Sequence, residues 1–484
     1  MRLQTIARQQ RGVIIPGITY YTTNNKRTEM PIFWWRRHKA DPHTTPVAPV
    51  TIPRSEHAIS RSLISENALK VLYRLKEAGY AAFLVGGCVR DLMLGREPKD
   101  FDVVTEATPE QIKEVFRNAR LIGRRFRLAH VHFGREIIEV ATFRAKPLAV
   151  TERDDDADEG EGRLLRDNVF GTQEEDALRR DFTVNSLYYN IRDFTVVDYM
   201  GGMQDLKKGI LRMIGDPATR YREDPVRMLR AIRFAAKLGF SIEPGTAAPI
   251  RERGQLLLEV PPARMFEEVI KLFHGGHALA TFELLRQYGL FRYLFPLTED
   301  SLATEENNFP RVLVPEALAN TDARIAQDKP VNPAFMFAAF LWEPVRQERQ
   351  RLEAKGMNPH DALQHASERV LREQQRHITI PKRFSMPMRE IWDMQSKLLR
   401  RHGKHAERLI EHKRFRAAYD FLLLRAHAGE VDKELADWWT RFQEVTPDER
   451  DGLVSALAPQ EGPARRKRRP RKRRPAAARA PDGS

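Results

Sequence analysis

Two aspartates that lie two positions apart, Asp100 and Asp102, are the residues whose type and spacing point most directly to chemistry. They flank Phe101 at the start of an apolar segment that predicts a β-strand, and alternate side chains of a strand point to one face of its sheet. Two carboxylates on one face repel each other unless a cation lies between them. Hard oxygen ligands favour Mg²⁺, which also recruits phosphate groups. The pair therefore predicts a metal site for a phosphate-bearing compound.

A glycine pair precedes these aspartates. Gly86 and Gly87 end a short apolar run and are followed by residues 88–94, which predict a helix. Glycines let the backbone approach a ligand closely, and a helix N-terminus favours an anion. Arg90, on the first turn, can pair with a phosphate oxygen, whereas Asp91 either holds Arg90 or caps the loop. Strand, glycine turn, helix, loop and strand in this order predict a metal-dependent nucleotide site.

Polar residues in two later segments could complete such a site. Glu139 lies in the strand-like run 136–143, and Arg180 and Asp181 precede the strand-like run 183–190. An arginine and a carboxylate at that position could meet a triphosphate and a ribose, or they could form an ordinary salt bridge where the strand begins. The sequence leaves both interpretations open.

A later segment, 225–238, predicts a helix with a polar series along it. Asp224, Arg227 and Arg230 recur every three residues, so they shift by about 60° per step around one side. A carboxylate accepts from an exocyclic amine, and an arginine donates to a ring nitrogen. Asp224 and Arg227 could thus read the N6 and N1 edge of adenine without a template. The alternative is a surface ion pair worth roughly a few tenths of a kcal/mol.

The elements around these residues predict an α+β fold. Short apolar runs and glycine turns predict a small mixed sheet with antiparallel hairpins, and after Gly201 almost only helical periodicity is present. We expect a disordered extension (1–58), a sheet-containing head (59–205), a helical neck (206–275), a helical body (276–455) and a disordered basic tail (456–484).

The chain is basic, with 81 lysines and arginines against 66 aspartates and glutamates, a net charge of +15. Residues 463–484 alone hold ten basic residues and one acidic residue. Such a tail indicates a polyanionic partner, most often nucleic acid. The tail residues expected to bind it are Arg465, Arg466, Lys467, Arg468, Arg469, Arg471, Lys472, Arg473 and Arg474.

Several classes of protein are excluded by composition. The densest apolar run, 334–342, is far shorter than the ~20 residues of a membrane span. The single cysteine, Cys88, excludes an internal disulfide framework. His130 and His132 have no further ligands at zinc spacing, so we expect structural roles for them. The start of the sequence has no continuous apolar core, so we expect no secretory signal and a cytoplasmic setting.

Five segments together resemble a known family. They are LVGGCVRD (84–91), DFDVVT (100–105), IIEVATFR (137–144), RRDFTVNSLYYN (179–190) and EDPVRMLRAIRFAAKLGF (223–240). This set resembles the head-domain signature of the class II nucleotidyltransferases, in the DNA polymerase beta-type superfamily. That class comprises bacterial poly(A) polymerases and CCA-adding tRNA nucleotidyltransferases. The segment LIGRRFRLAHVHFG (121–134) and the basic tail resemble poly(A) polymerases rather than CCA-adding enzymes.

The resemblance implies a template-independent poly(A) polymerase that adds AMP from ATP to RNA 3′ ends and releases pyrophosphate, in support of RNA processing and turnover. It implies two Mg²⁺ ions, or Mn²⁺ in their place, held by Asp100 and Asp102, with Glu139 or Asp181 as the third carboxylate. The implied nucleotide-binding residues are Gly86, Gly87, Arg90, Arg180, Asn185, Asp224, Arg227 and Arg230, and Arg124, Arg125 and Arg127 are expected to bind RNA. We expect a monomer with RNA and ATP as partners and RNA-decay proteins as further ones.

Two alternatives stay open from the sequence. A CCA-adding tRNA enzyme would use the same chemistry with a different choice of nucleotide. An RNA-binding adaptor with an inactive head belongs to another class, and the full set of carboxylates argues against it.

Overall fold

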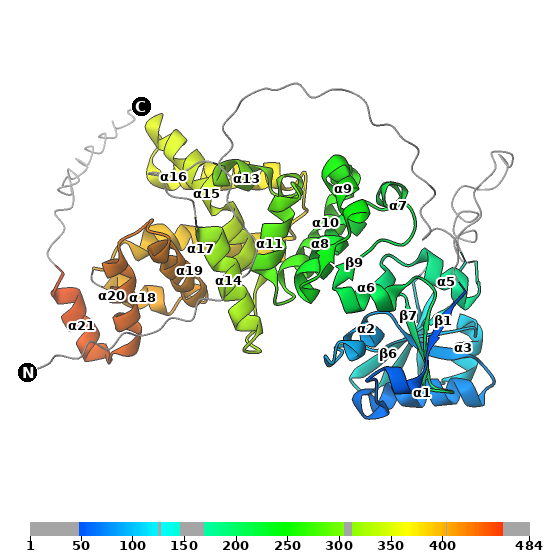
Figure 1. Ribbon diagram of the computed structural model, residues 1–484. Helices are drawn as coiled ribbons and strands as arrows, with labels where there is room; N and C mark the ends of the chain where they lie inside the picture. Colours follow the sequence, from blue (N-terminus) through cyan, green and yellow to red (C-terminus); the bar gives the residue numbers. More distant parts are fainter. Residues whose placement is uncertain (1–47, 124–126, 146–168, 304–311, 403, 458–484) are drawn as a thin grey trace, which may run out of the picture. The chain divides into compact units, whose positions relative to one another are not determined.

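The computed structural model describes residues 48–123, 127–145, 169–303, 312–402 and 404–457, which all fall in one compact unit of the chain (Figure 1). Arg124, Arg125, most of the N-terminal extension and the basic tail lie outside the described residues. The predicted disorder of both chain ends and the predicted RNA contacts of these residues therefore stay predictions.

An eight-stranded mixed sheet forms the head, in the order β1-β8-β7-β2-β3-β6-β5-β4. Its strands are β1 (Val50–Ile52), β2 (Ala82–Val85), β3 (Asp102–Thr105), β4 (Ala119–Ile122), β5 (Leu128–Phe133), β6 (Glu136–Thr142), β7 (Leu187–Asn190) and β8 (Val196–Asp198). Neighbouring strands pair antiparallel except β3 and β6, which run parallel. The predicted mixed sheet with antiparallel hairpins is confirmed.

Alternation along the strands decides which side of the sheet each residue covers. The helices on the sheet are α1 (Glu66–Glu77), α2 (Gly87–Met93), α3 (Pro109–Val115) and α5 (Gln173–Arg179). Leu84 and Val103 point to the face covered by α1 and α3 and join the main hydrophobic core. Val85 and Val104 point to the opposite face, where they pack with Ala177 of α5. The two faces therefore have separate cores, and α5 lies over the second.

Helices make up most of the chain after the sheet, as predicted. They are α6 (Gly202–Lys208), α7 (Pro217–Glu223), α8 (Val226–Leu238), α9 (Pro244–Arg253), α10 (Pro262–Phe273), α11 (Ala278–Gln287), α12 (Phe291–Leu294), α13 (Pro296–Leu302), α14 (Leu313–Ile325), α15 (Pro333–Ala354), α16 (Pro359–Gln374), α17 (Lys382–Leu398), α18 (Lys404–Ile410), α19 (Phe415–His427), α20 (Lys433–Glu444) and α21 (Pro447–Ser455). Short 3₁₀ helices are η2 (Arg54–Glu56), η3 (Arg61–Leu63), η4 (Thr183–Asn185) and η5 (Gly254–Glu259).

Two details correct the expected architecture. The N-terminal extension is ordered before residue 58, where disorder was expected. Strand β1 pairs with β8 and buries Ile52. His57 Nε2 also lies 2.9 Å from the carbonyl oxygen of Phe194. A strand of three residues carries no periodicity of its own and is stabilised by a distant partner. Beyond Gly201, the chain also contains a two-stranded sheet of β9 (Ile210–Leu211) and β10 (Ser241–Ile242).

One hydrophobic core runs through the described chain from Ile52 on β1 to Leu424 on α19. A third core, around Trp439, is shared by the end of α17, α18, the other side of α19 and α20. The expected boundaries near residues 205 and 275 do not coincide with separate cores, so they stay predictions. Within the described ranges, no helix has the length and apolar character needed to cross a bilayer.

Candidate active site

Asp102 and Glu139 lie side by side on the α5 face of the sheet. Asp102 is the first residue of β3 and pairs in register with Glu139 of β6. Alternation puts both on the face that carries Val104. His130 of β5 is the next residue in this row, and its Nε2 lies 3.5 Å from Glu139 Oε1. Polar side chains thus form a row across three adjacent strands, and the structural role predicted for His130 includes a contact with an acidic residue.

Asp100 lies in the bend before β3 rather than on the strand. The predicted strand therefore started one residue too early, at Phe101, because the apolar pattern extends beyond the paired segment. Strand alternation alone does not bring Asp100 beside Asp102. Asp100 still lies close enough to act on Asp102 electrostatically, and it contributes to raising the pKa of that carboxyl group.

The Asp102 side chain lies in an acidic environment. Desolvation by the surrounding protein raises the pKa of Asp102 most, and the Glu139 carboxylate raises it further; Arg180 lowers it, and Asp100 adds a smaller rise, so that the pKa reaches about 6. The side chain is still accessible to solvent. The surroundings of this accessible carboxyl group disfavour its charged form, and a nearby cation would stabilise that form.

The donor set at this place fits a hard divalent cation. Asp100, Asp102 and Glu139 offer carboxylate oxygens, which are the ligands that Mg²⁺ prefers. Within the described ranges, no group of three His, Cys, Asp or Glu side chains is already arranged to hold a metal ion. The fit therefore rests on the chemistry of the donors and on their mutual repulsion, which a cation would relieve.

Arg180 faces the glycine turn between β2 and α2. Gly86 has a φ of 75°, which favours glycine, and a Cβ atom there would lie 3.5 Å from Arg180 Nη1. Asp176 and Tyr188 hold this guanidinium group, with Nη2 donating to Asp176 Oδ2 at 2.9 Å and Nε donating to the Tyr188 hydroxyl at 3.0 Å. Burial by itself would raise the pKa of Asp176, but Arg180 and Arg179 hold it below its usual value. One side of Arg180 is thus fixed by protein while its Nη1 faces the turn.

Arg90 is buried beneath this turn, with 2% of its surface exposed. Its Nε donates to Asp91 Oδ1 at 2.8 Å, and its Nη1 donates to Asn185 Oδ1 at 2.6 Å. Of the two interpretations of Asp91, holding Arg90 is confirmed. Asp91 also lies 3.5 Å from Lys237 Nζ of α8, and Arg96, in the loop before β3, donates to the Lys237 carbonyl oxygen at 3.2 Å. These contacts connect the glycine turn and the aspartate loop to the C-terminal end of α8.

Asp181 is engaged with Arg230 of α8. The Asp181 Oδ2 atom accepts from Arg230 Nε at 2.8 Å and from Nη2 at 2.5 Å, while Oδ1 accepts from the Phe182 amide at 2.8 Å. Asn185 Nδ2 donates to Oδ1 at 3.4 Å. Burial would raise the pKa of Asp181, but Arg230 and these donors hold it below its usual value. The salt-bridge interpretation of Asp181 is therefore confirmed, and contact of this segment with a triphosphate or a ribose stays a prediction.

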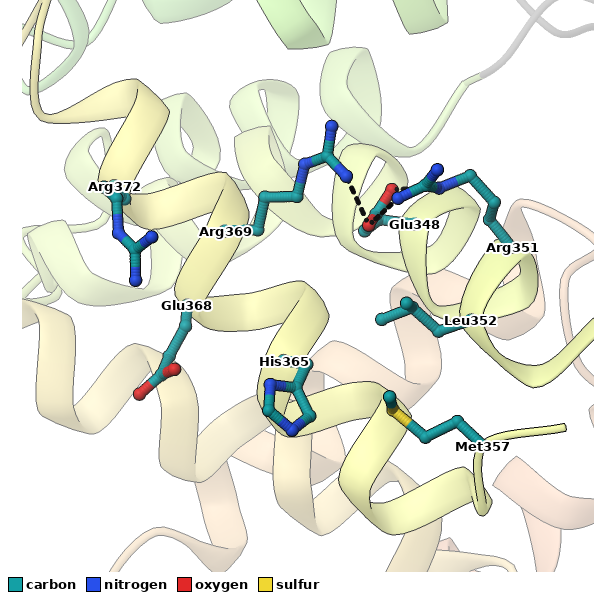
Figure 2. Close-up of a pocket in the computed structure, with 8 residues that line it drawn as sticks. All are labelled: Glu348, Arg351, Leu352, Met357, His365, Glu368, Arg369 and Arg372. Carbon is teal, nitrogen blue, oxygen red and sulfur yellow. Dashed lines mark hydrogen bonds and ion pairs between the residues drawn. The ribbon is translucent and has the colours of Figure 1, made fainter. Parts of the chain in front are cut away.

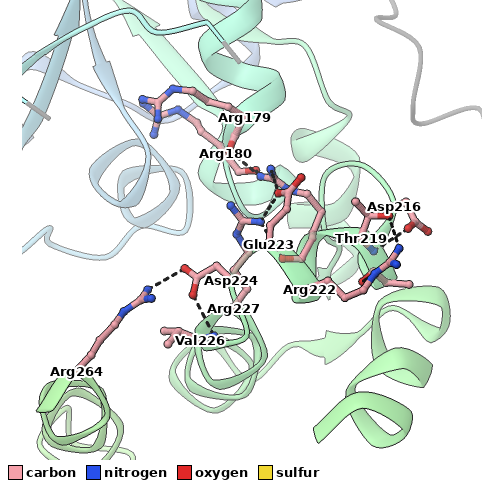
Figure 3. Close-up of polar contacts among 12 residues, drawn as sticks. Arg179, Arg180, Asp216, Thr219, Arg222, Glu223, Asp224, Val226, Arg227 and Arg264 are labelled. Atoms are coloured by element: carbon pink, nitrogen blue, oxygen red, sulfur yellow. Dashed lines mark hydrogen bonds and ion pairs between the residues drawn. The ribbon is translucent and has the colours of Figure 1, made fainter. Parts of the chain in front are cut away.

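Asp224 and Arg227 lie where α7 ends and α8 begins, and both are engaged in ion pairs (Figure 3). Asp224 Oδ2 accepts from Arg264 Nη2 of α10 at 2.9 Å. Arg227 Nη1 donates to Glu223 Oε2 at 2.8 Å and to the Arg220 carbonyl oxygen at 2.9 Å. Asp224 and Arg227 do not pair with each other, as the surface-pair alternative expected, but each forms an ion pair with a different residue, and their base-reading role stays a prediction.

Two residues near the site were missed by the sequence analysis. Arg233 continues the three-residue series of α8 and lies over the Phe234 ring at 4.6 Å from its centroid; its buried Nε has no hydrogen-bond partner among the described residues. The spacing that identified Arg230 could have identified Arg233. Arg264 lies on a separate helix, so no local sequence signal links it to Asp224.

The described part of the predicted RNA-binding cluster is Arg127. Its Nη1 lies 2.6 Å from Glu110 Oε1 of α3, and both side chains are more than half exposed. An exposed pair of this kind contributes little to stability. Its ability to bind RNA stays a prediction.

The mixed sheet, the glycine turn and the carboxylate row are the features of a nucleotidyltransferase head. The solved structure of the CCA-adding enzyme of Bacillus stearothermophilus in complex with CTP has this fold, with a TM-score of 0.54 at 23% identity over 83% of this chain and 90% of that one. At this identity the likeness shows the fold alone.

Sequence comparison identifies the family. The family models that match are the poly A polymerase head domain at residues 82–212, the probable RNA and SrmB-binding site of polymerase A at 239–302, and the polymerase A arginine-rich C-terminus at 355–474. The chain is 54% identical to poly(A) polymerase I of Escherichia coli over 88% of this chain and 92% of that protein. A CC-adding tRNA nucleotidyltransferase of Halalkalibacterium halodurans is 35% identical over 48% of this chain and 54% of that protein. The chain belongs to the bacterial poly(A) polymerase family.

Proposed function

We propose that Asp102, Glu139 and Asp100 mark the place where this protein transfers AMP from ATP to the 3′-hydroxyl of RNA and releases pyrophosphate. The chain is a polynucleotide adenylyltransferase of the template-independent poly(A) polymerase type, as its family indicates. The observation that carries the placement of the reaction is the register of Asp102 with Glu139, with Arg180 near enough to lower the pKa of Asp102.

The family and its ATP substrate imply a divalent metal ion. Asp100, Asp102 and Glu139 would hold Mg²⁺, for which Mn²⁺ could substitute. When bound, the metal lowers the pKa of an attacking hydroxyl and offsets the charge of the departing pyrophosphate. We favour Glu139 over Asp181 as the third carboxylate, because Asp181 is already neutralised by Arg230.

The chain's own groups would bind and orient the triphosphate. Gly86 and Gly87 leave room for phosphate oxygens near the backbone, and Arg180 Nη1 faces that room. Arg230, held by Asp181, would contact the phosphates or the ribose. We assign Arg90 and Asn185 to positioning rather than to direct contact, because Arg90 is buried and donates to Asn185.

The adenine base would be read by Asp224 and Arg227. A carboxylate accepting from N6 and a guanidinium donating to N1 match adenine and exclude guanine and uracil, whose corresponding atoms are an acceptor and a donor. In the present structure Arg264 and Glu223 hold these two side chains at the junction of α7 and α8. Because these contacts fix the two side chains, they support the proposal that Asp224 and Arg227 present their polar groups to the base in one orientation.

Extension of a labelled, unstructured RNA with each of the four nucleoside triphosphates separately tests this function. Long tails with ATP alone are expected. Incorporation of C limited to tRNA ends would instead support a CCA-adding enzyme, and RNA binding without any extension in ATP and Mg²⁺ would support an inactive adaptor.

RNA and ATP are the partners that the proposed reaction requires. A cytoplasmic location, a monomeric state and association with RNA-decay proteins stay predictions. Light scattering of the purified chain and recovery of bound proteins from cell extract test the last two.

A further inference from the structure

A cavity of about 510 Å³ lies in the helical body, away from the carboxylate row. It is enclosed by α14, the N-terminal end of α15 and α19, with His274 from the end of α10 at its edge. The volume falls within the range of about 300–1,000 Å³ that is usual for small-molecule pockets. Except for His274, its lining lies outside the segment that matches the RNA-binding family model.

The inner wall of this cavity is apolar and includes an aromatic ring. Phe335 and Met336 line it from α15, and Leu424 lines it from α19. The Phe335 ring packs edge-on against Phe421, with centroids 5.9 Å apart and planes at 79°, which fixes its orientation. A ring that is held in place and partly accessible is a stacking platform for a nucleobase.

Charged groups surround the apolar wall. Arg324, Lys413 and Arg416 line the cavity with Asp420 as the acidic residue. Asp420 Oδ1 lies 3.0 Å from Arg416 Nε, and burial raises the pKa of Asp420 although Arg416 and Arg324 lower it. Lys413 and Arg414 both form ion pairs with the same carboxylate, Glu390. Basic groups therefore outnumber acidic ones here. These groups would suit a nucleotide whose base carries an exocyclic amine. The carboxylate can accept from the amine, and the cations can pair with the phosphate.

We propose that this cavity binds one adenylate residue of single-stranded RNA, upstream of the 3′ end that is being extended. The base lies against Phe335, its exocyclic amine donates to Asp420, and its phosphate meets Arg324 or Lys413. The proposal rests on the proposed function, because the product of that reaction is a run of adenylates. A site for an upstream nucleotide of the tail would favour RNA that already carries a run of adenylates.

A second hollow in the same helical body provides a contrast (Figure 2). It has a volume of about 280 Å³, and its lining contains no phenylalanine, tyrosine or tryptophan. Glu348 lies between Arg351, at 2.8 Å, and Arg369, at 3.0 Å, so this hollow has charged groups but no ring on which a base could stack. Arg369 is exposed, as Arg324 is, and therefore offers a matched control for loss of one arginine.

Binding of labelled A15 and U15 to the full chain without ATP tests the site. Phe335→Leu removes stacking while keeping an apolar side chain, and we expect A15 affinity to fall at least about fivefold. Arg324→Gln should lower the affinity for both oligomers, by about fivefold for one charge-assisted contact. Arg369→Gln should change neither affinity. Because Phe335 contacts Phe421, thermal melting must show that Phe335→Leu folds; Arg324→Gln, at an exposed position, keeps the test independent of folding.

ATP-dependent extension of primers of increasing length separates this proposal from the proposed function. Both variants should extend a five-nucleotide primer as wild type does and lose efficiency with longer A-primers. Unchanged A15 affinity together with normal extension would overturn the adenylate site while leaving the polymerase function intact. Failure of the wild type to extend any primer would overturn the polymerase function itself. Competition by free AMP as effective as that by A15 would show a mononucleotide site instead and would overturn the RNA assignment.

Discussion

Arg264 of α10 donates a hydrogen bond of 2.9 Å to Asp224, a residue 40 positions earlier in the chain. Asp224 is the residue that we propose to accept from the adenine amine, so the direction of its carboxylate matters for the choice of nucleotide. An arginine that fixes this direction would act on selectivity without touching the reacting groups.

Arg264→Ala is therefore expected to reduce the preference for ATP over GTP by about tenfold, the equivalent of one lost charge-assisted hydrogen bond. The ratio of kcat/KM for the two nucleotides measures it. Arg286→Ala is a control, since Arg286 also pairs with a carboxylate, Glu299, at 3.1 Å, and neither residue belongs to the proposed base-reading pair. A ratio that stays at the wild-type value would mean that Arg264 has no part in base selection.

Asp102→Asn is expected to lower kcat by at least about a thousandfold, because it removes an anionic ligand where metal stabilises transition-state charge. RNA affinity and thermal stability should stay near wild type, since the side chain is accessible to solvent. Glu110→Gln, at an exposed carboxylate paired with Arg127, is the control. Substantial residual turnover in Asp102→Asn would contradict the placement of the reaction.

Metal affinity should depend on pH through the same residue. The pKa of Asp102 is raised to about 6, so the metal must displace a proton below that value. Apparent Mg²⁺ affinity is expected to rise by up to about tenfold per pH unit below 6 and to level off above it. Without metal, the raised pKa means that the folded protein binds this proton more tightly than the unfolded chain does. The free energy of unfolding of the metal-free protein should therefore fall as pH rises from about 4 to 6. Calorimetric titration and melting curves from pH 4 to 8 measure both effects.

Asp181→Asn is expected to lower the free energy of unfolding by about 1–3 kcal/mol, because it leaves Arg230 without its anion in a partly buried site. The native pKa of Asp181 lies below its usual value, so this contribution is present at neutral pH and is lost as pH falls below about 4. Urea unfolding at pH 7 and pH 3.5 measures it. Glu110→Gln, in the exposed pair with Arg127, should cost less than about 0.5 kcal/mol. An equal loss in both variants would argue against a special role of the Asp181 pair.

Deletion of residues 463–484 is expected to weaken RNA binding and to flatten its dependence on salt. These residues hold ten basic side chains and one acidic one, and each phosphate contact with single-stranded RNA contributes about 0.7 to the salt slope. Anisotropy of labelled RNA at increasing salt measures both. An unchanged affinity with an unchanged slope would show that the tail serves another purpose.

Local patterns were sufficient to predict most of the helices and the central strands. The helices α2 and α8 and the strands β3 and β6 have strong apolar periodicity or bounding glycines, and they lie within one residue of their predicted ends. The strands β1 and β4 were missed because three or four residues carry too little periodicity and depend on distant partners. The fold class was predictable because it required only the order of these elements.

The candidate site was predictable in its residue types but not in its contacts. Gly86, Asp100 and Asp102 could be identified from spacing within one segment. The register of Asp102 with Glu139 depends on a parallel pairing between strands separated by α3 and two further strands, which no local pattern specifies. Arg264 could not be found for the same reason, since its partner lies on another helix.

The contacts of Asp91 and Arg96 with the end of α8 have a mechanical consequence. One end of this helix carries Asp224 and Arg227, and the other end is attached to the loop that leads to Asp100. Because an α-helix is stiff, a shift at the end that we propose to read the base would reach the loop that we propose to bind the metal. Under that proposal, binding of the correct base and alignment of the acidic side chains would be coupled through a single rigid helix.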